Sequence, residues 1–405
     1  GCVTYYTSLL PGSFKQYSTP FDSFWCCVGT GMENHSKYAE SIYFKDNQEL
    51  LVNLYIPSRL HWKEKGLKLT LDTYFPESDT VTVRMDEIGS YTGMLLFRYP
   101  DWVSGDAVVR INGKPAQTEA HKGSYIRLLD SVKSGDVITL VFTRNLYIDY
   151  AKDEPHFGSV MYGPILLAGG LGTDDMPEDK VIDNRACRES LPAKNIPMLV
   201  GPLADLDSWI QCSSQHPLRF TVKNGGGQQG VGLIPYFQMH HQRHTVYWKL
   251  YSPDEFVYRT RSLTDEVKIG DEKDEGKHAL QGENDSIYWH DYFWAKNTRF
   301  RMAKDGWFSY TLHINKTEQK PYHLICRFWG DEPDTCQFDI LIDGNYLRTV
   351  SLNRKLYLTY VDDVYSIPAD WTRGKDKVNV TFRAAQGKNA GGLYELKITS
   401  DTNYR

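Results

Sequence analysis

Residues 67–75 read LKLTLDTYF and residues 80–85 read TVTVRM, two runs in which apolar and polar side chains alternate. Because successive side chains of a β-strand point to opposite faces, the alternation predicts two strands with one buried face each. Similar runs surround them at a spacing of about ten residues, with turn residues between: LLVNLYIP at 50–57, GMLLFRYP at 93–100, AVVRING at 107–113, SYIRLL at 124–129 and DVITLVF at 136–142. This spacing predicts an antiparallel β-sandwich.

The same kind of pattern returns in the C-terminal third of the chain. The alternating runs there are WFSYTLHI at 307–314, YHLICRFWG at 322–330, FDILIDG at 338–344, YLRTVSL at 346–352, DDVYSIP at 362–368, KVNVTF at 377–382 and LYELKIT at 393–399. We expect a second sandwich from these runs. The two regions share an architecture but no internal sequence repeat.

The segments around the sandwiches set the predicted domain limits. Asn112-Gly113 predicts a hairpin, and the apolar run at 160–168 is expected to be a buried strand that closes the first sandwich. Residues 171–200 are rich in Gly, Asp, Pro and Lys, which is typical of a linker. The predicted parts are 1–47, a sandwich at 48–170, a linker with a small β unit at 171–262, and a C-terminal jelly-roll accessory domain at 263–405.

One helix is expected near the N-terminus. In GMENHSKYAESIYF at 31–44, Met32, Tyr38 or Ala39, Ile42 and Tyr43 recur near one face at helical spacings. The chain is therefore predicted to be mainly β, with tandem antiparallel β-sandwich (jelly-roll-like) domains and a short N-terminal helical part.

Composition excludes several classes of partner. The chain has 405 residues, enough for two or three domains, with 41% hydrophobic and 24% charged residues. A net charge of −5 gives no basic surface for nucleic acid or anionic lipid. No apolar run approaches the roughly 18 residues of a membrane span. No signal peptide is expected in this chain, and seven cysteines imply no disulfide framework.

The densest chemical segment is FWCCVGTGMENH at 24–35. Cysteine acts as a nucleophile or metal ligand in its thiolate form, and zinc stabilises that form. Cys26 and Cys27 are therefore candidates for metal or thiolate chemistry, with two buried small hydrophobes as the alternative. Glu33 is equally explained by a favourable interaction with the helix dipole, and His35 by packing.

Two further groups are weaker candidates. The stretch YFQMHHQRH at 236–244 is either a metal site or a polar strand in which His240 and His244 share a face and His241 points away. The C-terminal aromatics Trp289, Tyr292, Trp294, Trp307 and Trp329 favour either carbohydrate binding or a structural role. Asp339, Asp343 and Gly344 are more simply explained by a strand entering a turn than by calcium.

The run FWCCVGTGMENHSKY at 24–38, preceded by Pro11-Gly12 and Tyr17 and followed by LLVNLYIPSRLHWKEKGLKL at 50–69, resembles the β-L-arabinofuranosidases of glycoside hydrolase families 127 and 146. That resemblance implies an (α/α)6-barrel catalytic domain followed by β-sandwich domains. It also implies removal of β-linked L-arabinofuranose with retention of configuration, and bound zinc. Residues 1–47 are then expected to be a helical remnant of the barrel that carries the Cys-Cys motif.

By this resemblance Cys26 looks like the nucleophile that forms a thioglycosyl intermediate, and both Cys26 and Cys27 look like zinc ligands. In the family, the remaining zinc ligands, a Glu and another Cys, and the acid/base Glu come from barrel sequence upstream of the pair. Cys2 and Glu33 do not match those positions. We therefore expect this polypeptide by itself to bind zinc weakly or not at all and to be inactive, with the barrel of the same polypeptide as its missing partner.

The leading hypothesis is thus the C-terminal portion of a retaining glycoside hydrolase acting on arabinose-containing plant-type glycans, secreted or periplasmic. A non-catalytic carbohydrate-binding or structural module is the alternative. A thiol redox protein is a third hypothesis, disfavoured because Cys26-Cys27 lacks the two-residue spacer of common redox motifs.

Overall fold

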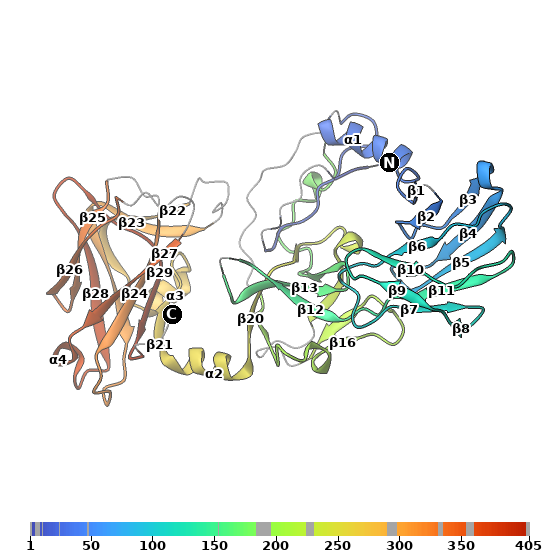
Figure 1. Ribbon diagram of the computed structural model, residues 1–405. Helices are drawn as coiled ribbons and strands as arrows, with labels where there is room; N and C mark the ends of the chain where they lie inside the picture. The colour runs from blue at the N-terminus through green and yellow to red at the C-terminus, as the bar shows by residue number, and fades with distance from the viewer. Residues whose placement is uncertain are drawn as a thin grey trace. The chain divides into compact units, whose positions relative to one another are not determined.

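The structure is a computed structural model, and it describes residues 2–4, 9, 11–23, 25–46, 48–152, 154–183, 196–223, 231–289, 298–330, 335–353 and 360–401. The chain forms two compact units, Gly1–Glu189 with Lys194–Tyr251, and Ser190–Ala193 with Ser252–Arg405 (Figure 1). The described residues are mostly β-strand, as the sequence predicts. The helices are α1 (Cys26–Lys37), α2 (Pro253–Ser262), α3 (Glu272–Lys277) and α4 (Ala369–Thr372).

Two sheets of the first unit contain the runs from which the sandwich was predicted. One has the order β1-β2-β6-β10-β9 and the other β3-β4-β5-β11-β7-β8. The bounds are β1 (Tyr43–Asp46), β2 (Glu49–Val52), β3 (Ser58–Trp62), β4 (Leu67–Thr73), β5 (Thr80–Glu87), β6 (Leu95–Arg98), β7 (Val108–Ile111), β8 (Lys114–Pro115), β9 (Thr118–Ala120), β10 (Tyr125–Leu128) and β11 (Val137–Val141).

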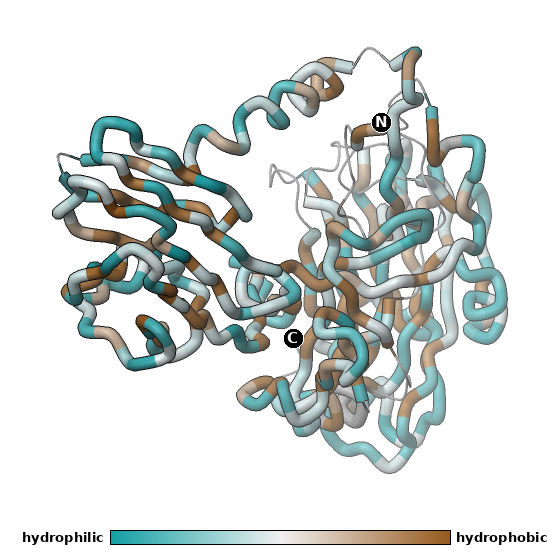
Figure 2. The backbone as a smooth tube through the Cα atoms, turned by 90° about the vertical axis from the view of Figure 1, so that its right-hand side faces the viewer, coloured by the Kyte–Doolittle hydropathy of each residue, from teal (hydrophilic) through white to brown (hydrophobic). Residues whose placement is uncertain are grey.

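The alternating pattern of the sequence produces the core between these sheets. In β4 the buried residues are Leu67, Leu69 and Leu71, and β5 pairs with it so that Leu71 stands opposite Val83. The side chains in between are polar and more exposed, so hydrophobic and hydrophilic residues alternate along the strands (Figure 2). At the turn between β7 and β8, Asn112 has φ 49° and Gly113 φ 79°. Two positive φ angles are what a two-residue hairpin requires, so the predicted hairpin is confirmed.

A third sheet of the same unit has the order β15-β20-β13-β14-β18-β17-β16, with β12 paired to β13 and β19 to β14. Its strands are β12 (Leu146–Tyr150), β13 (Phe157–Tyr162), β14 (Ile165–Gly170), β15 (Leu199–Val200), β16 (Ile210–Cys212), β17 (Phe220–Val222), β18 (Val231–Pro235), β19 (His244–Thr245) and β20 (Trp248–Tyr251).

The apolar run at 160–168 was expected to close the first sandwich, and that expectation is wrong. β13 and β14 pair inside this third sheet, where they pack on Trp248 and Leu233.

The His-rich stretch at 236–244 holds the N-terminal segment against this sheet. The buried Arg243 donates from Nε to the carbonyl oxygen of Gly12 at 2.6 Å, and the Gly12 amide donates to the carbonyl oxygen of His244 at 2.9 Å. His244 in turn donates its amide to the carbonyl oxygen of Ser13 at 2.8 Å. Lys15 donates from Nζ to the carbonyl oxygen of Tyr236. The segment that leads to α1 is thereby fixed to residues more than 200 positions later.

His240 and His241, the two exposed histidines of that stretch, contact the same N-terminal segment. The Tyr17 hydroxyl is hydrogen-bonded to Nδ1 of His240, and the Tyr17 ring stacks on His241 with centroids 5.5 Å apart. The prediction of a strand in which His241 points away is wrong. Tyr236–Gln238 forms a 3-10 turn and His241 has φ 51°, so both rings reach Tyr17. In the described part of the chain, neither His240 nor His241 belongs to a cluster of three or more His, Cys, Asp or Glu side chains that could hold a metal ion.

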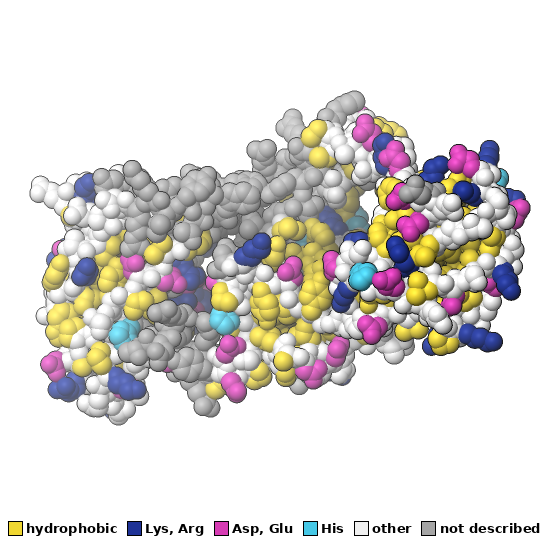
Figure 3. Space-filling view, in the orientation of Figure 1, with side chains coloured by type: hydrophobic (Ala, Val, Ile, Leu, Met, Phe, Trp, Pro, Cys, Tyr) yellow, Lys and Arg dark blue, Asp and Glu magenta, His cyan; other side chains and the backbone are white. Residues whose placement is uncertain are grey.

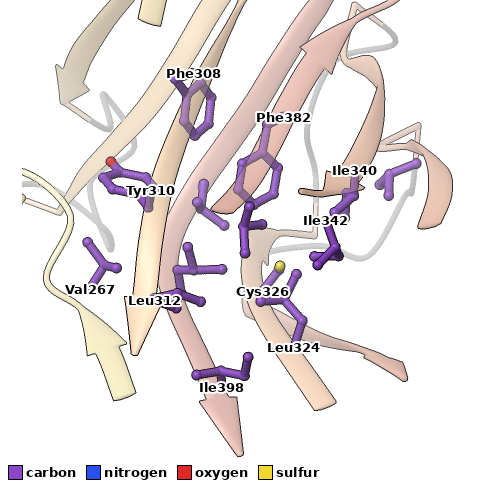
Figure 4. Packing of buried hydrophobic residues seen from close by; sticks show 14 of the residues in the cluster. Val267, Phe308, Tyr310, Leu312, Leu324, Cys326, Ile340, Ile342, Phe382 and Ile398 are labelled. Atoms are coloured by element: carbon purple, nitrogen blue, oxygen red, sulfur yellow. The ribbon is translucent and has the colours of Figure 1, made fainter. Parts of the chain in front are cut away.

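The second unit is one nine-stranded sheet system with the order β26-β25-β28-β23-β29-β24-β27, to which β21 and β22 are added. Its strands are β21 (Leu263–Val267), β22 (Gln281–Trp289), β23 (Arg299–His313), β24 (Tyr322–Trp329), β25 (Gln337–Ile342), β26 (Asn345–Ser351), β27 (Tyr360–Ile367), β28 (Lys377–Ala384) and β29 (Asn389–Thr399). Its core gathers side chains from β23, β24, β25 and β28, among them Phe308, Phe382 and Ile340 (Figure 4). The Phe308 and Phe382 rings stack with centroids 5.0 Å apart.

Truncation of Phe382 tests this core. Phe382 is fully buried against Phe308 and Phe338, so Phe382→Ala should lower the free energy of unfolding by about 3–5 kcal/mol because it leaves a cavity. Denaturant unfolding of the second unit, followed by tryptophan fluorescence, measures the loss. Val364→Ala, at a side chain that is 55% exposed, is the matched control and should stay within about 0.5 kcal/mol. Equal effects of the two changes would contradict this packing.

The burial of His244 predicts a pH dependence of the first unit. Desolvation is the main cause that lowers the pKa of His244 from 6.5 to about 4. The unfolded chain therefore gains this proton near pH 6.5 while the folded chain stays neutral until about pH 4, so stability decreases as the pH is lowered across that window. The contribution lost between pH 7 and pH 5 is about 2 kcal/mol.

Denaturant unfolding at pH 7 and pH 5 checks this prediction. The difference between the two pH values should be smaller by about that amount in His244→Gln, whereas the exposed His121→Gln should behave like the wild type. An unchanged pH dependence in His244→Gln would show that the imidazole is not buried in its neutral form.

Candidate functional site

The helix that carries the cysteine pair begins earlier than the sequence pattern predicted. The predicted range was 31–44, whereas α1 starts at Cys26 and ends at Lys37. Tyr43 and Phe44 lie instead in β1, where they pair with Val52 and Leu51 of β2. This strand pairing outweighs the helical spacing that Ile42 and Tyr43 share with Met32.

The early start of α1 places both thiols in its first turn. Trp25 is the N-cap residue, and its carbonyl oxygen accepts from the Val28 amide at 3.0 Å. Phe24, which belongs to the predicted motif, lies outside the described residues. A Cβ at Gly31 would lie 3.2 Å from Cγ1 of Val3, so glycine allows the N-terminal segment to approach the helix closely.

The two thiols differ in their environments. Cys26 is exposed and Cys27 half-buried, and both are reduced. Burial, together with the hydrogen bond and the charge of Cys26, raises the pKa of the Cys27 thiol above its ordinary value. Cys27 is therefore a thiol at neutral pH unless a cation stabilises its thiolate. The helix N-terminus, with its partial positive charge, is the positive element that the fold itself supplies there.

Glu33 and His35 do not join the cysteine pair. A helix rises 1.5 Å per residue, so Glu33 lies about 10 Å along the axis from Cys26 and His35 lies farther. Both side chains are exposed, and His35 packs beside Tyr38 with ring centroids 5.4 Å apart. The twelve-residue segment is therefore dense in sequence but not in space. Of these four candidates, Cys26 and Cys27 are the two that lie next to each other.

Zinc can be tested against this donor set. Thiolates are of the right chemical kind, but zinc normally takes four ligands. Among the described residues, no third His, Cys, Asp or Glu atom lies within the reach of a shared ion with the two sulfurs. At the cysteine pair, the described residues therefore do not supply a complete ligand set for zinc.

The helix α1 also presents an unusual surface. It buries none of its residues, and Met32 and Tyr38 are 68% and 55% exposed. The side chains seen over α1 include hydrophobic, acidic and basic groups next to one another (Figure 3). The helix has no buried face of its own. The N-terminal segment approaches it at Val3, and Tyr17 of that segment is hydrogen-bonded to His240.

Sequence reasoning missed the residues that position this helix. Arg243 and Lys15 hold the N-terminal segment, and each acts on backbone carbonyl groups more than 200 residues away. Burial lowers the pKa of Arg243, while the charges of Asp175 and Asp174 oppose that change. No local pattern marks these residues, because their role depends on a long-range pairing.

The C-terminal aromatic residues do not form one common surface in the described part of the chain. Trp329 is buried against Tyr360, while Trp289 is 49% exposed and lies under the Arg299 guanidinium at 4.6 Å. Tyr292 and Trp294 lie outside the described residues. The groove of about 570 Å³ between β26 and β27 is lined by Leu347–Ser351 and Asp363–Ser366, without any of these tryptophans.

The acidic residues considered for calcium have other partners. Asp343 binds Lys375 and the Asn379 amide, each at 2.7 Å, and Asp339 accepts from Thr349. They therefore hold the turn and the edge strand, as the simpler interpretation predicted. In the described part of the chain, no helix is both long and apolar enough to cross a membrane.

Comparison with known families divides the chain into four matched regions. Residues 1–40 match the family described as β-L-arabinofuranosidase, GH127 catalytic domain, and residues 49–144 match its middle domain. Residues 147–250 match a domain of unknown function, and residues 260–399 match a second family of unknown function. The cysteine pair thus lies in the region that matches the catalytic domain.

Solved structures show likenesses of lower identity. One described as a glycoside hydrolase has 20% identity and a TM-score of 0.45, over 62% of this chain and 45% of its own. A GH127 β-L-arabinofuranosidase from Geobacillus stearothermophilus T6 has 18% identity and a TM-score of 0.39, over 56% and 37%. A GH127 β-arabinofuranosidase has 17% identity and a TM-score of 0.35, over 52% and 37%.

The chain therefore spans less than half the length of each of these structures. No curated protein matches it. By the matches of residues 1–40 and 49–144, this chain is GH127-like: these two regions are similar to the catalytic and the middle domain of that β-L-arabinofuranosidase family.

Proposed function

We propose that this chain supplies part of the active site of a retaining glycoside hydrolase that acts on β-L-arabinofuranosides of plant-type glycans. The observation that carries the proposal is the position of Cys26 and Cys27. They lie next to each other in the first turn of α1, inside the region that matches the GH127 catalytic domain. The carbohydrate substrate and an exported location follow from the same family likeness.

Cys26 is the proposed nucleophile. Its sulfur is exposed at the helix start, where the partial positive charge favours a thiolate. The thiolate attacks the anomeric carbon, a C–S bond forms, and the glycosidic C–O bond breaks with its electron pair on the leaving oxygen, which takes a proton from an acid. Water then gives a proton to the conjugate base of that acid and attacks the same carbon, and the C–S bond breaks to restore the thiolate. Two displacements at one carbon give retention of configuration.

Cys27 is the second proposed zinc ligand beside Cys26. Its raised pKa means that the protein surroundings alone do not hold it as a thiolate, and a bound zinc would supply the missing positive charge. Two more ligands and the acid have to come from outside the described residues. The exposed Met32 of α1 and Tyr38 directly after it support a larger helical domain as the source of these groups, because such a domain would cover this helix.

A catalytic assay tests this function. On an aryl β-L-arabinofuranoside, the chain by itself should show no turnover above background, whereas a polypeptide that also contains the rest of a GH127 catalytic domain should hydrolyse it. In that longer polypeptide Cys26→Ser should lower kcat at least about a thousandfold, as the loss of a covalent nucleophile does. The control Cys212→Ser, an exposed thiol of β16, should leave kcat unchanged.

A different experimental result would contradict each part of the proposal. Robust turnover by the chain alone would refute the need for further ligands. A full rate in Cys26→Ser would refute the nucleophile. A longer polypeptide that binds glycans without hydrolysing them would favour a non-catalytic carbohydrate-binding module.

The interaction between the two thiols gives a second prediction. Since Cys26 raises the pKa of Cys27 through its hydrogen bond and charge, Cys26→Ser should move the pH profile of Cys27 alkylation to lower pH in the presence of a chelator. Peptide mass spectrometry after iodoacetamide treatment at several pH values measures the rate at Cys27. The same profile should be unchanged in Cys212→Ser, and an unmoved profile in Cys26→Ser would show that the sulfurs do not interact.

A further inference from the structure

Three side chains distant in sequence meet in the second unit. Asp265 lies in β21, His278 directly follows α3, and His313 is the last residue of β23. One ligand atom from each lies within 4.8 Å of the other two. This is the one such trio of His, Cys, Asp or Glu side chains among the described residues, and no sequence motif links its members.

The Asp265 carboxylate lies between the two imidazole rings. Its Oδ1 is 3.3 Å from Nε2 of His278, and its Oδ2 is 3.1 Å from Nδ1 of His313. Oδ2 also accepts the His313 amide at 2.6 Å, and Oδ1 accepts the Glu266 amide at 3.0 Å. Two backbone amides therefore fix the orientation of the carboxylate.

His278 is oriented as a metal ligand would be. Its side chain is 6% exposed, and Nδ1 lies 2.7 Å from the carbonyl oxygen of Asp274. A carbonyl oxygen only accepts, so Nδ1 donates to Asp274, and Nε2 is the ring nitrogen that faces the Asp265 carboxylate. A ring N–H donated to a backbone carbonyl is the usual outer contact of a metal-bound histidine.

The elements that carry the trio are rigidly joined. Arg301 of β23 donates twice to the Glu275 carboxylate of α3, at 3.0 and 2.9 Å, and the Tyr310 hydroxyl donates to the same carboxylate at 2.6 Å. The His278 carbonyl oxygen accepts the Thr311 amide at 2.7 Å. These contacts fix the backbone that carries His278 and His313.

We propose that Asp265, His278 and His313 bind one divalent transition-metal ion of the zinc type. Two imidazoles and one carboxylate match zinc, whereas calcium prefers oxygen ligands alone. The ring nitrogens lie 3.3 Å from Oδ1 and 3.1 Å from Oδ2 of Asp265, and separations of this size are usual between donors that share one ion with metal–ligand bonds of about 2.0 Å. His313 is 63% exposed, so the fourth position opens to water. The ion would join β21, α3 and β23.

Zinc titration of the full chain tests this site. Cys26 and Cys27 are both changed to Ser in every protein used, so that the thiols contribute no zinc binding. Calorimetric titration with zinc sulfate should then show one ion per chain, and His313→Ala should weaken binding at least about tenfold. The matched control His121→Ala removes an exposed histidine from the first unit and should bind zinc like its parent.

Two further measurements separate a site from nonspecific uptake. Zinc should raise the thermal unfolding midpoint of the parent but not of His313→Ala, because only a ligand of the folded state stabilises it. Cobalt(II) should give a ligand-field spectrum without sulfur charge-transfer bands, and Asp265→Asn should weaken that spectrum. Absence of zinc binding in the parent, or equal binding by His313→Ala and His121→Ala, would overturn the proposal.

Discussion

The contact between the buried Arg243 guanidinium and the backbone of Gly12 is the interaction on which the placement of the cysteine helix depends. A buried charge is costly unless it is hydrogen-bonded, and Arg243 meets this requirement with the carbonyl groups of Gly12 and Asp174. His244 and Lys15 add further bonds to the same segment. Because α1 buries none of its own residues, these contacts rather than a helix core connect the two thiols to the sheets.

The chemistry of the cysteine pair follows from where the helix starts. At its first turn Cys26 is exposed to a reactant, while Cys27 is half-buried beside it with a raised pKa. A pair of this kind requires added positive charge for both sulfurs to act as thiolates. This requirement is the physical support for the proposal of a zinc-bound thiolate, and the pair lies in the region similar to the GH127 catalytic domain.

The candidate metal site of the second unit positions its donor side chains differently from the cysteine pair. Its cluster of Asp265, His278 and His313 draws each donor from a separate element and fixes them through the buried pair of Arg301 and Glu275. The thiol pair instead takes both donors from one helical turn. The two sites lie in different units with separate cores, so each can be changed without removing the packing that supports the other.

The sequence by itself determined the mainly β character, the strands with alternating side chains such as 67–73 and 80–87, and the hairpin at Asn112-Gly113, because these are encoded by neighbouring residues. It also indicated Cys26 and Cys27 as candidate site residues. Tertiary structure decided that β13 and β14 join the third sheet, that Tyr43 leaves the predicted helix for β1, and that Glu33 and His35 stand apart from the thiols. It alone brought Arg243 to Gly12 and Asp265 to two histidines. Such contacts depend on the pairing of distant strands and on burial, and neither is encoded in a local pattern.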